Sequence, residues 1–127
     1  MTRSTDRRPV FFNLSQIQMP VGALTSITHR MTGVLLAIGV PFTIYLMDRS
    51  VQSQEGYAEV IALFERLYAK CGLIFLIWSL THHLLAGVRH LLSDIDFGSL
   101  LPASRRSAWI VNLTGFAAAL LATGVVL

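Results

Sequence analysis

Three long runs without Asp, Glu, Lys or Arg dominate the hydrophobic and polar pattern of the chain. They cover residues 31–47, 71–88 and 107–127. Each is close to the ~20 residues that an α-helix needs to cross a hydrocarbon core of ~30 Å. With flanking residues added, the pattern predicts an all-α membrane protein. Its single domain, 1–127, would contain three transmembrane helices at roughly 21–48, 63–93 and 105–127.

The polar segments between these runs are predicted to be loops. Residues 48–65 are rich in Asp, Glu and Gln, and we expect a loop leading into an early helical turn. Residues 96–104 contain one Gly and one Pro, which is typical of a loop. Pro41 lies inside the first expected helix and should kink it, as membrane helices tolerate. The semi-apolar stretch 10–18 is expected to lie at the membrane surface.

Composition supports lipid as the solvent of this chain. It is 54% hydrophobic and only 13% charged, against ~25% charged in average soluble domains. The net charge of +3 does not indicate nucleic-acid binding, because most Arg residues flank the apolar runs, where they contact headgroups. The single cysteine, Cys71, excludes an intrachain disulfide and cannot by itself hold an iron–sulfur cluster or structural zinc. We interpret Cys71 as a packing residue.

The distribution of basic residues predicts the orientation in the membrane. One side of a three-helix topology would carry Arg3, Arg7, Arg8, Arg30, Arg89, Arg105 and Arg106. The other side would carry Arg49, Arg66 and Lys70, offset by four acidic residues. The positive-inside rule therefore places the N-terminus in the cytoplasm. The polar start has no signal-peptide core and is short for a transit peptide, which favours a bacterial cytoplasmic (inner) membrane.

Two adjacent histidines are the ionisable residues inside the three runs. Ionisable groups within a span are costly, so His82 and His83 are candidates for function. Because adjacent helix residues point about 100° apart, at most one of them faces a given neighbour. Either could simply form a hydrogen bond to a facing helix. We interpret His82 in that way, as a packing or hydrogen-bonding residue.

The spacing around His83 favours a b-type haem. One helical stripe contains Ser79, His83, Gly87 and His90. Ala86 and Gly87 would leave room for a flat, bulky group. Imidazole is a common axial haem ligand, and His90 lies ~10 Å further along the helix axis at ~1.5 Å per residue. Arg89 and His90 at the membrane boundary would then suit the two propionates.

A haem held by His83 would be incomplete in this chain alone. Neither the first run nor the third contains a histidine, and the third contains no methionine. If the haem is coordinated by two histidines, the second axial ligand must come from another polypeptide.

The segment from Ser26 to Arg30 is the second candidate site. It begins the first expected helix on the same side of the membrane as Arg89 and His90. It could be an ordinary helix entry, capped by a hydroxyl and with His29 and Arg30 reaching the headgroups. It could also be a quinone site, in which the Ser26 hydroxyl and the Arg30 cation bond the ring oxygens.

Two motifs resemble a known family. Arg8-Pro9, followed by Ser26-Ile27-Thr28-His29-Arg30-Met31-Thr32-Gly33, resembles the pattern R-P…S-I-x-H-R-x-[ST]-G. The segment from His83 to Leu91, with Asp94 following, resembles H-x-x-x-G-x-R-H-L-x-x-D. Both patterns are those of the succinate dehydrogenase cytochrome b556 family, which forms part of the membrane anchor of complex II. With the three-helix frame, the resemblance covers essentially the whole chain.

The resemblance implies a complex and a set of ligands. It implies a haem b shared with a second small hydrophobic anchor subunit, and flavoprotein and iron–sulfur subunits on the cytoplasmic face. Electrons would pass from succinate through those subunits to ubiquinone. By position, His83 matches the axial ligand, Ser26 and Arg30 match quinone-site residues, and His29, Arg30 and His90 match residues near the propionates. Asp94 matches as well, and its role in capping or docking stays open.

Two other functions fit the pattern less well. A haem-free structural anchor, as in some fumarate reductases, would not need a histidine in mid-span on a stripe of small residues. A transporter or channel subunit would be expected to have ionisable groups along a pore or paired broken helices, and two of the runs are uncharged throughout. The chain has no flavin or nucleotide motif, so it is not expected to be a complete enzyme.

Overall fold

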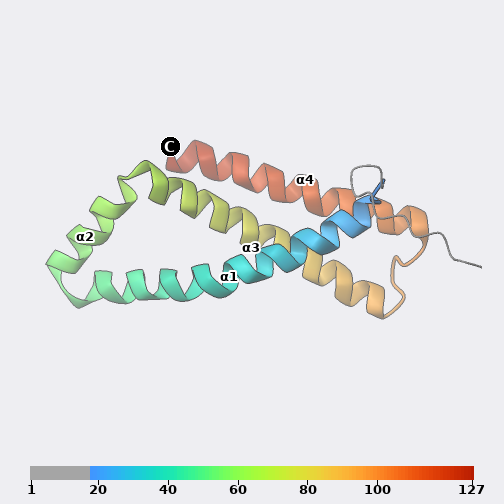
Figure 1. Cartoon of the computed structure of the whole chain (residues 1–127), viewed down its shortest axis with the longest axis horizontal. Helices are drawn as coiled ribbons and strands as arrows, with labels where there is room; N and C mark the ends of the chain where they lie inside the picture. Colours follow the sequence, from blue (N-terminus) through green and yellow to red (C-terminus); the bar gives the residue numbers. More distant parts are fainter. Residues whose placement is uncertain (1–17) are drawn as a thin grey trace, which may run out of the picture.

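The computed structural model describes residues 18–127, and this part of the chain is helical as predicted (Figure 1). Its helices are α1 (Val21–Gln52), α2 (Gln54–Phe64), α3 (Leu67–Asp94) and α4 (Leu101–Val126). Within this part, three helices, α1, α3 and α4, are long and apolar enough to cross a membrane. The all-α fold with three transmembrane helices is therefore confirmed. Of the expected surface stretch 10–18, all but Gln18 lies outside the described residues.

Helix α3 lies between α1 and α4 and packs against both (Figure 1). The N-terminal half of α1 crosses α3 and also contacts α4, whereas its C-terminal half diverges from α3 and is joined to it by α2. The axis of α1 changes direction part-way along (Figure 1), and Pro41 lies inside this helix, as predicted. Pro41 cannot donate to the carbonyl group four residues earlier, and this local loss allows the bend.

The centre of the bundle is small and built from small side chains. Its buried apolar residues are Ala86, Ala108, Val111 and Ala122. Most large apolar side chains point outward, as expected where lipid or another membrane subunit replaces water. Cys71 was expected to be a buried packing residue, and that expectation was wrong because its position on α3 faces outward.

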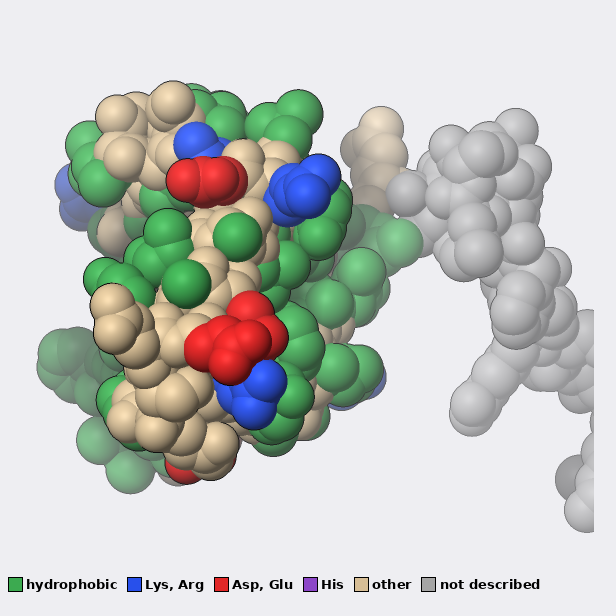
Figure 2. Space-filling view, turned by 90° about the vertical axis from the view of Figure 1, so that its left-hand side faces the viewer, with side chains coloured by type: hydrophobic (Ala, Val, Ile, Leu, Met, Phe, Trp, Pro, Cys, Tyr) green, Lys and Arg blue, Asp and Glu red, His purple; other side chains and the backbone are tan. Residues whose placement is uncertain are grey.

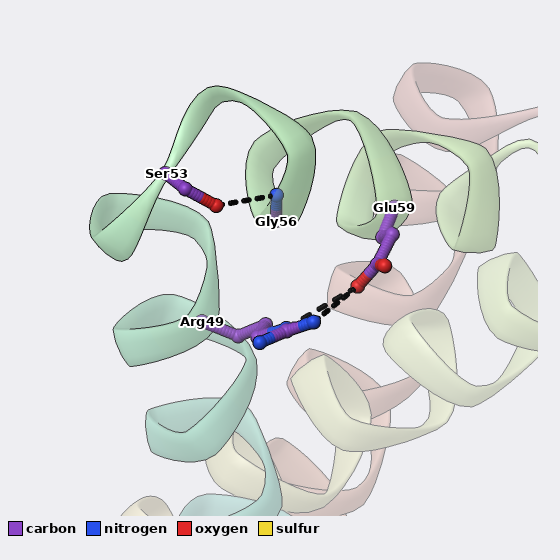
Figure 3. Close-up of polar contacts among 4 residues, drawn as sticks. All are labelled: Arg49, Ser53, Gly56 and Glu59. Atoms are coloured by element: carbon purple, nitrogen blue, oxygen red, sulfur yellow. Dashed lines mark hydrogen bonds and ion pairs between the residues drawn. The ribbon is translucent and has the colours of Figure 1, made fainter.

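The segment predicted to be a loop, 48–65, is mostly helical, so that prediction was wrong. Helix α1 continues to Gln52, and α2 follows after the single extended residue Ser53. The Ser53 hydroxyl accepts a hydrogen bond from the Gly56 main-chain nitrogen at 3.0 Å (Figure 3). Serine is a favoured N-cap residue because its oxygen satisfies a free donor of the first turn. The polar composition of residues 48–65 indicated that this segment is exposed. The Ser53 cap favours a helix as the structure of its second part.

The corner between α1 and α2 is closed by polar contacts and a glycine (Figure 3). The Arg49 guanidinium bonds the Glu59 carboxylate at 3.0 Å. Gly56 lies so close to the Arg49 carbonyl oxygen that a Cβ atom on this residue would clash with it. Figure 2 views the molecule from this end, where acidic and basic side chains are mixed. The mixture agrees with the sequence, which offsets the basic residues on this side with acidic ones.

The connection between α3 and α4 is a loop, as predicted. Asp96 and Gly98 both have positive φ, at 59° and 72°, conformations that turns use. Helix α4 begins at Leu101 rather than at residue 105, because Pro102 is accepted in the first turn of a helix, where no main-chain donor is needed.

Candidate functional site

Three of the four histidines meet between α1 and α3. The His29 ring stacks on the His83 ring with a centroid distance of 4.2 Å and an interplanar angle of 17°. The His90 ring lies 5.2 Å from His29. The two sequence motifs, one on α1 and one on α3, therefore form one site. Within residues 18–127, no group of three or more His, Cys, Asp or Glu side chains is arranged to hold a metal ion.

The His83 ring is oriented by α1. Its Nδ1 atom lies 3.0 Å from the main-chain oxygen of His29 and 3.3 Å from the Thr32 hydroxyl. The Thr32 side chain is fully buried and also bonds the carbonyl groups of Thr28 and His29. A carbonyl oxygen can only accept, so Nδ1 carries the proton and donates it. In a neutral imidazole with its proton on Nδ1, Nε2 has the lone pair that a metal ligand needs.

Small residues provide the close approach of α1 and α3. A Cβ atom at Gly33 would lie 3.0 Å from Cε1 of His83, and one at Gly87 would lie 3.5 Å from Nε2 of His29. Ala86 has no exposed surface. The sequence suggested that Ala86 and Gly87 leave room for a flat group such as a haem, and this stays a prediction. In this structure the His29 ring lies against Gly87, so the small residues also let α1 and α3 pack closely.

The Arg89 side chain extends from α3 toward the start of α4, and one Nη atom also lies 3.5 Å from where a Cβ atom of Gly22 on α1 would be. Its Nε donates to the Ser107 hydroxyl at 3.0 Å, and one Nη donates to the hydroxyl and the carbonyl group of Ser104 at 2.7 and 3.3 Å. The side chain thus joins the C-terminal part of α3 to the first turns of α4. Of the residues expected near the propionates, the structure brings His29 and His90 together, and the hydrogen bonds of Arg89 go to Ser104 and Ser107.

Ser26 and Arg30 are one helical turn apart on α1, on the same face of the helix. Ser26 is half-buried and Arg30 is exposed. Neither side chain forms a hydrogen bond with another of the residues 18–127 for which contacts are described. They therefore offer a hydroxyl group and a cation at the end of α1 that lies beside the histidine cluster.

A second polar cluster joins all three long helices. His82 is buried, with 1% of its surface exposed, and its Nε2 lies 3.0 Å from Oδ1 of Asn112 on α4. The Asn112 amide nitrogen donates to the hydroxyl of Thr25 on α1 at 3.0 Å, and Thr25 donates to the Val21 carbonyl at 3.0 Å. The interpretation of His82 as a hydrogen-bonding residue is confirmed.

Comparison with known proteins points to a transmembrane family, in agreement with the membrane spans of the fold. The model of the succinate dehydrogenase/fumarate reductase transmembrane subunit family matches residues 4–122. The chain belongs to that family. It is 32% identical to the succinate dehydrogenase cytochrome b556 subunit of Coxiella burnetii over 117 residues, covering 91% of this chain and 94% of the relative. It is 30% identical to the subunit of the same name from Paracoccus denitrificans, covering 80% of this chain and 78% of the relative.

Family membership defines the general role of the chain. Its relatives are subunits of succinate dehydrogenase, so the chain is a multi-pass membrane subunit of an oxidoreductase complex and not a catalyst by itself. Sequence reasoning missed several residues that build the site. Thr32 and Gly33 stood in the quoted motif without a role, and Asn112 was not singled out. An amide inside an apolar span is a signal that could have found Asn112.

Proposed function

We propose that this chain is the haem b- and quinone-binding membrane anchor of a succinate:ubiquinone oxidoreductase, complex II. The observation that carries the proposal is the bond from Nδ1 of His83 to the main-chain oxygen of His29, 3.0 Å long. Metal-binding histidines commonly donate their second ring nitrogen to a carbonyl or carboxylate group, which fixes the ring and raises the basicity of the ligand. A haem-free structural anchor would have no use for a ring fixed in this way.

The donor set of the site fits a b-type haem. His83 would be one axial ligand, and a histidine of the second small hydrophobic anchor subunit would be the other. His29, Arg30 and His90 would bind the propionates, because cations and ring donors form strong hydrogen bonds to carboxylates. Arg89 could contribute only through the donors that Ser104 and Ser107 do not use. A bound haem would supply one-electron redox chemistry at this position.

Ser26 and Arg30 would bind the quinone. A hydroxyl group and a guanidinium group can each donate to a ring oxygen, and the isoprenoid tail would lie in the lipid. The guanidinium would also stabilise negative charge that develops on an oxygen during reduction. Electrons would arrive from the flavoprotein through the iron–sulfur subunit, both docked on the cytoplasmic face. The role of this chain would be to hold ubiquinone within reach of that subunit.

The orientation follows from the same arrangement. The N-terminus of α1 and the α3–α4 connection lie at one end of the bundle (Figure 1), and this end carries Arg30, Arg105 and Arg106. The opposite end has mixed charge (Figure 2). The positive-inside rule then favours a cytoplasmic N-terminus in a bacterial inner membrane.

The quinone assignment is tested with Ser26→Ala and Arg30→Ala in the assembled complex. Both variants should lower succinate-dependent quinone reduction, while succinate oxidation by an artificial soluble acceptor continues at the wild-type rate. Ser50→Ala, at the other end of α1, and Arg105→Ala, another exposed arginine, are the matched controls. Equal loss of both activities in Ser26→Ala would show an assembly defect and would contradict the assignment.

A further inference from the structure

We infer that Thr25, Asn112 and His82 form a clamp across α1, α4 and α3 that positions the His83 ring. This inference rests on the proposed function, because it concerns how the proposed haem ligand is held. The three residues are positioning residues, since none of them is placed in contact with haem or quinone.

Hydrogen bonds join the three residues of the clamp in sequence, from α1 through α4 to α3. The Thr25 hydroxyl donates to the Val21 carbonyl and accepts from the amide nitrogen of Asn112. The amide oxygen of Asn112 lies 3.0 Å from Nε2 of His82 and 3.3 Å from the Thr25 hydroxyl. Because an amide oxygen only accepts, Nε2 of His82 carries a proton and donates it to Asn112. The other ring nitrogen of His82, Nδ1, is buried without a hydrogen-bond partner among the described residues, so Asn112 alone fixes this ring by hydrogen bonding.

The clamp is buried where polar contacts between helices have no competition from water. Thr25 has no exposed surface and His82 has 1%. Gly115 on α4 permits the approach, because a Cβ atom there would lie 3.4 Å from Cβ of His82. Polar side chains that bond across membrane helices stabilise one relative placement of those helices. The clamp thus sets the rotation of α1 and α3 about their axes.

That rotation determines the environment of His83. Thr25 and His29 are one turn apart on α1, and His82 and His83 are adjacent on α3. The carbonyl oxygen that accepts from Nδ1 of His83 belongs to His29, so this bond joins the same two helices that the clamp aligns. A rotation of α1 that moves Thr25 away from Asn112 would also move the His29 carbonyl group away from His83. The clamp would therefore tune the hydrogen bond that raises the basicity of the ligand.

The test uses Thr25→Val, which keeps the shape of the side chain and removes its hydroxyl. Thr43→Val is the matched control, because Thr43 makes the same bond to the carbonyl group four residues earlier, at 2.9 Å, on an exposed face. Thr25→Ser retains the hydroxyl and should rescue the effect. Asn112→Leu removes the same contact from the opposite helix and gives a second route if one variant assembles poorly.

The readouts are the midpoint potential and the low-temperature electron paramagnetic resonance spectrum of the haem, in complexes matched for haem content. Weaker donation from His83 makes the ligand less basic, so Thr25→Val and Asn112→Leu should shift the potential to more positive values and move the low-spin signal. Thr43→Val and Thr25→Ser should match the wild type. Unchanged potentials and spectra in Thr25→Val and Asn112→Leu, or an equal shift in Thr43→Val, would overturn the clamp. Retention of haem by a His83→Ala complex would instead refute the proposed ligand.

Discussion

The Nδ1 atom of His83 on α3 lies 3.0 Å from the main-chain oxygen of His29 on α1, although the two residues are 54 positions apart in the sequence. A main-chain oxygen remains an acceptor whatever side chain occupies its position. The bond therefore orients the His83 ring independently of the His29 imidazole. The stacked His29 ring adds a second constraint, because it covers one face of His83.

Gly33→Ala should weaken haem binding. The added methyl group would lie 3.0 Å from Cε1 of His83, so the ring must shift away from its acceptor or the helices must separate. Overpacking of this kind costs on the order of 1–3 kcal/mol. Gly72→Ala on α3 is the control, because nothing lies within 4 Å of a Cβ atom there. We expect faster haem loss on heating in detergent for Gly33→Ala only, and equal haem loss in the two variants would refute the close-packing account.

Replacing Ser104 and Ser107 together by alanine should loosen α4 while leaving the haem spectrum unchanged. Both hydroxyls accept hydrogen bonds from Arg89, and a hydrogen bond to a charged group contributes roughly 1.5–3 kcal/mol. The melting temperature of the complex in detergent should therefore fall. Ser99→Ala, in the α3–α4 loop, should leave the melting temperature unchanged. If Arg89 mainly served a propionate, Arg89→Ala would change the haem potential and the serine variant would have little effect on stability.

Gly56→Ala should destabilise the corner between α1 and α2. The added Cβ atom would clash with the Arg49 carbonyl oxygen (Figure 3), and main-chain atoms cannot move aside as a flexible side chain can. The corner would have to open, at a cost on the order of 1–3 kcal/mol. Gly124→Ala near the end of α4 meets nothing within 4 Å and should behave as the wild type. Thermal unfolding of the complex in detergent compares the two variants.

Glu59→Gln should have almost no effect on stability. The carboxylate bonds Arg49 at 3.0 Å, but the side chains are 54% and 45% exposed. Exposed ion pairs gain little because water and salt screen them. The melting temperature should match that of the wild type at both low and high salt. A large fall for Glu59→Gln would mean that the ion pair, rather than the Ser53 cap and the Gly56 contact, holds the corner.

The long membrane spans could be predicted from the sequence, and so could the ionisable residues inside them, which are costly to bury in lipid. Runs without charge fix the number of membrane helices, and His83 stood out because ionisable groups are rare inside such runs. The loop predicted at 96–104 from Gly98 and Pro102 is confirmed up to Leu100, and Pro102 lies in the first turn of α4. Helix α2 was not predicted, because its polar composition was interpreted as a loop and Ser53 was not recognised as a helix N-cap.

Contacts between helices could not be predicted from one sequence. Periodicity places residues on a helical face but does not say which helix that face meets. The sequence indicated room beside Gly87 but could not show that the His29 ring of α1 lies against it. Arg89 was grouped with His90 because they are adjacent, yet adjacent residues diverge by about 100° around a helix, and Arg89 bonds to α4.

The central claim is that His83 is a haem ligand, and a reduced-minus-oxidised optical spectrum of the complex tests it most directly. The chain is expressed with its neighbouring small membrane subunit as the wild type, as His83→Ala and as Leu84→Ala, a control whose side chain is 61% exposed on the same helix. We predict a b-type spectrum in the wild type and in Leu84→Ala, with haem lost from His83→Ala while the subunit still inserts. A b-type spectrum of wild-type intensity in His83→Ala would contradict the account.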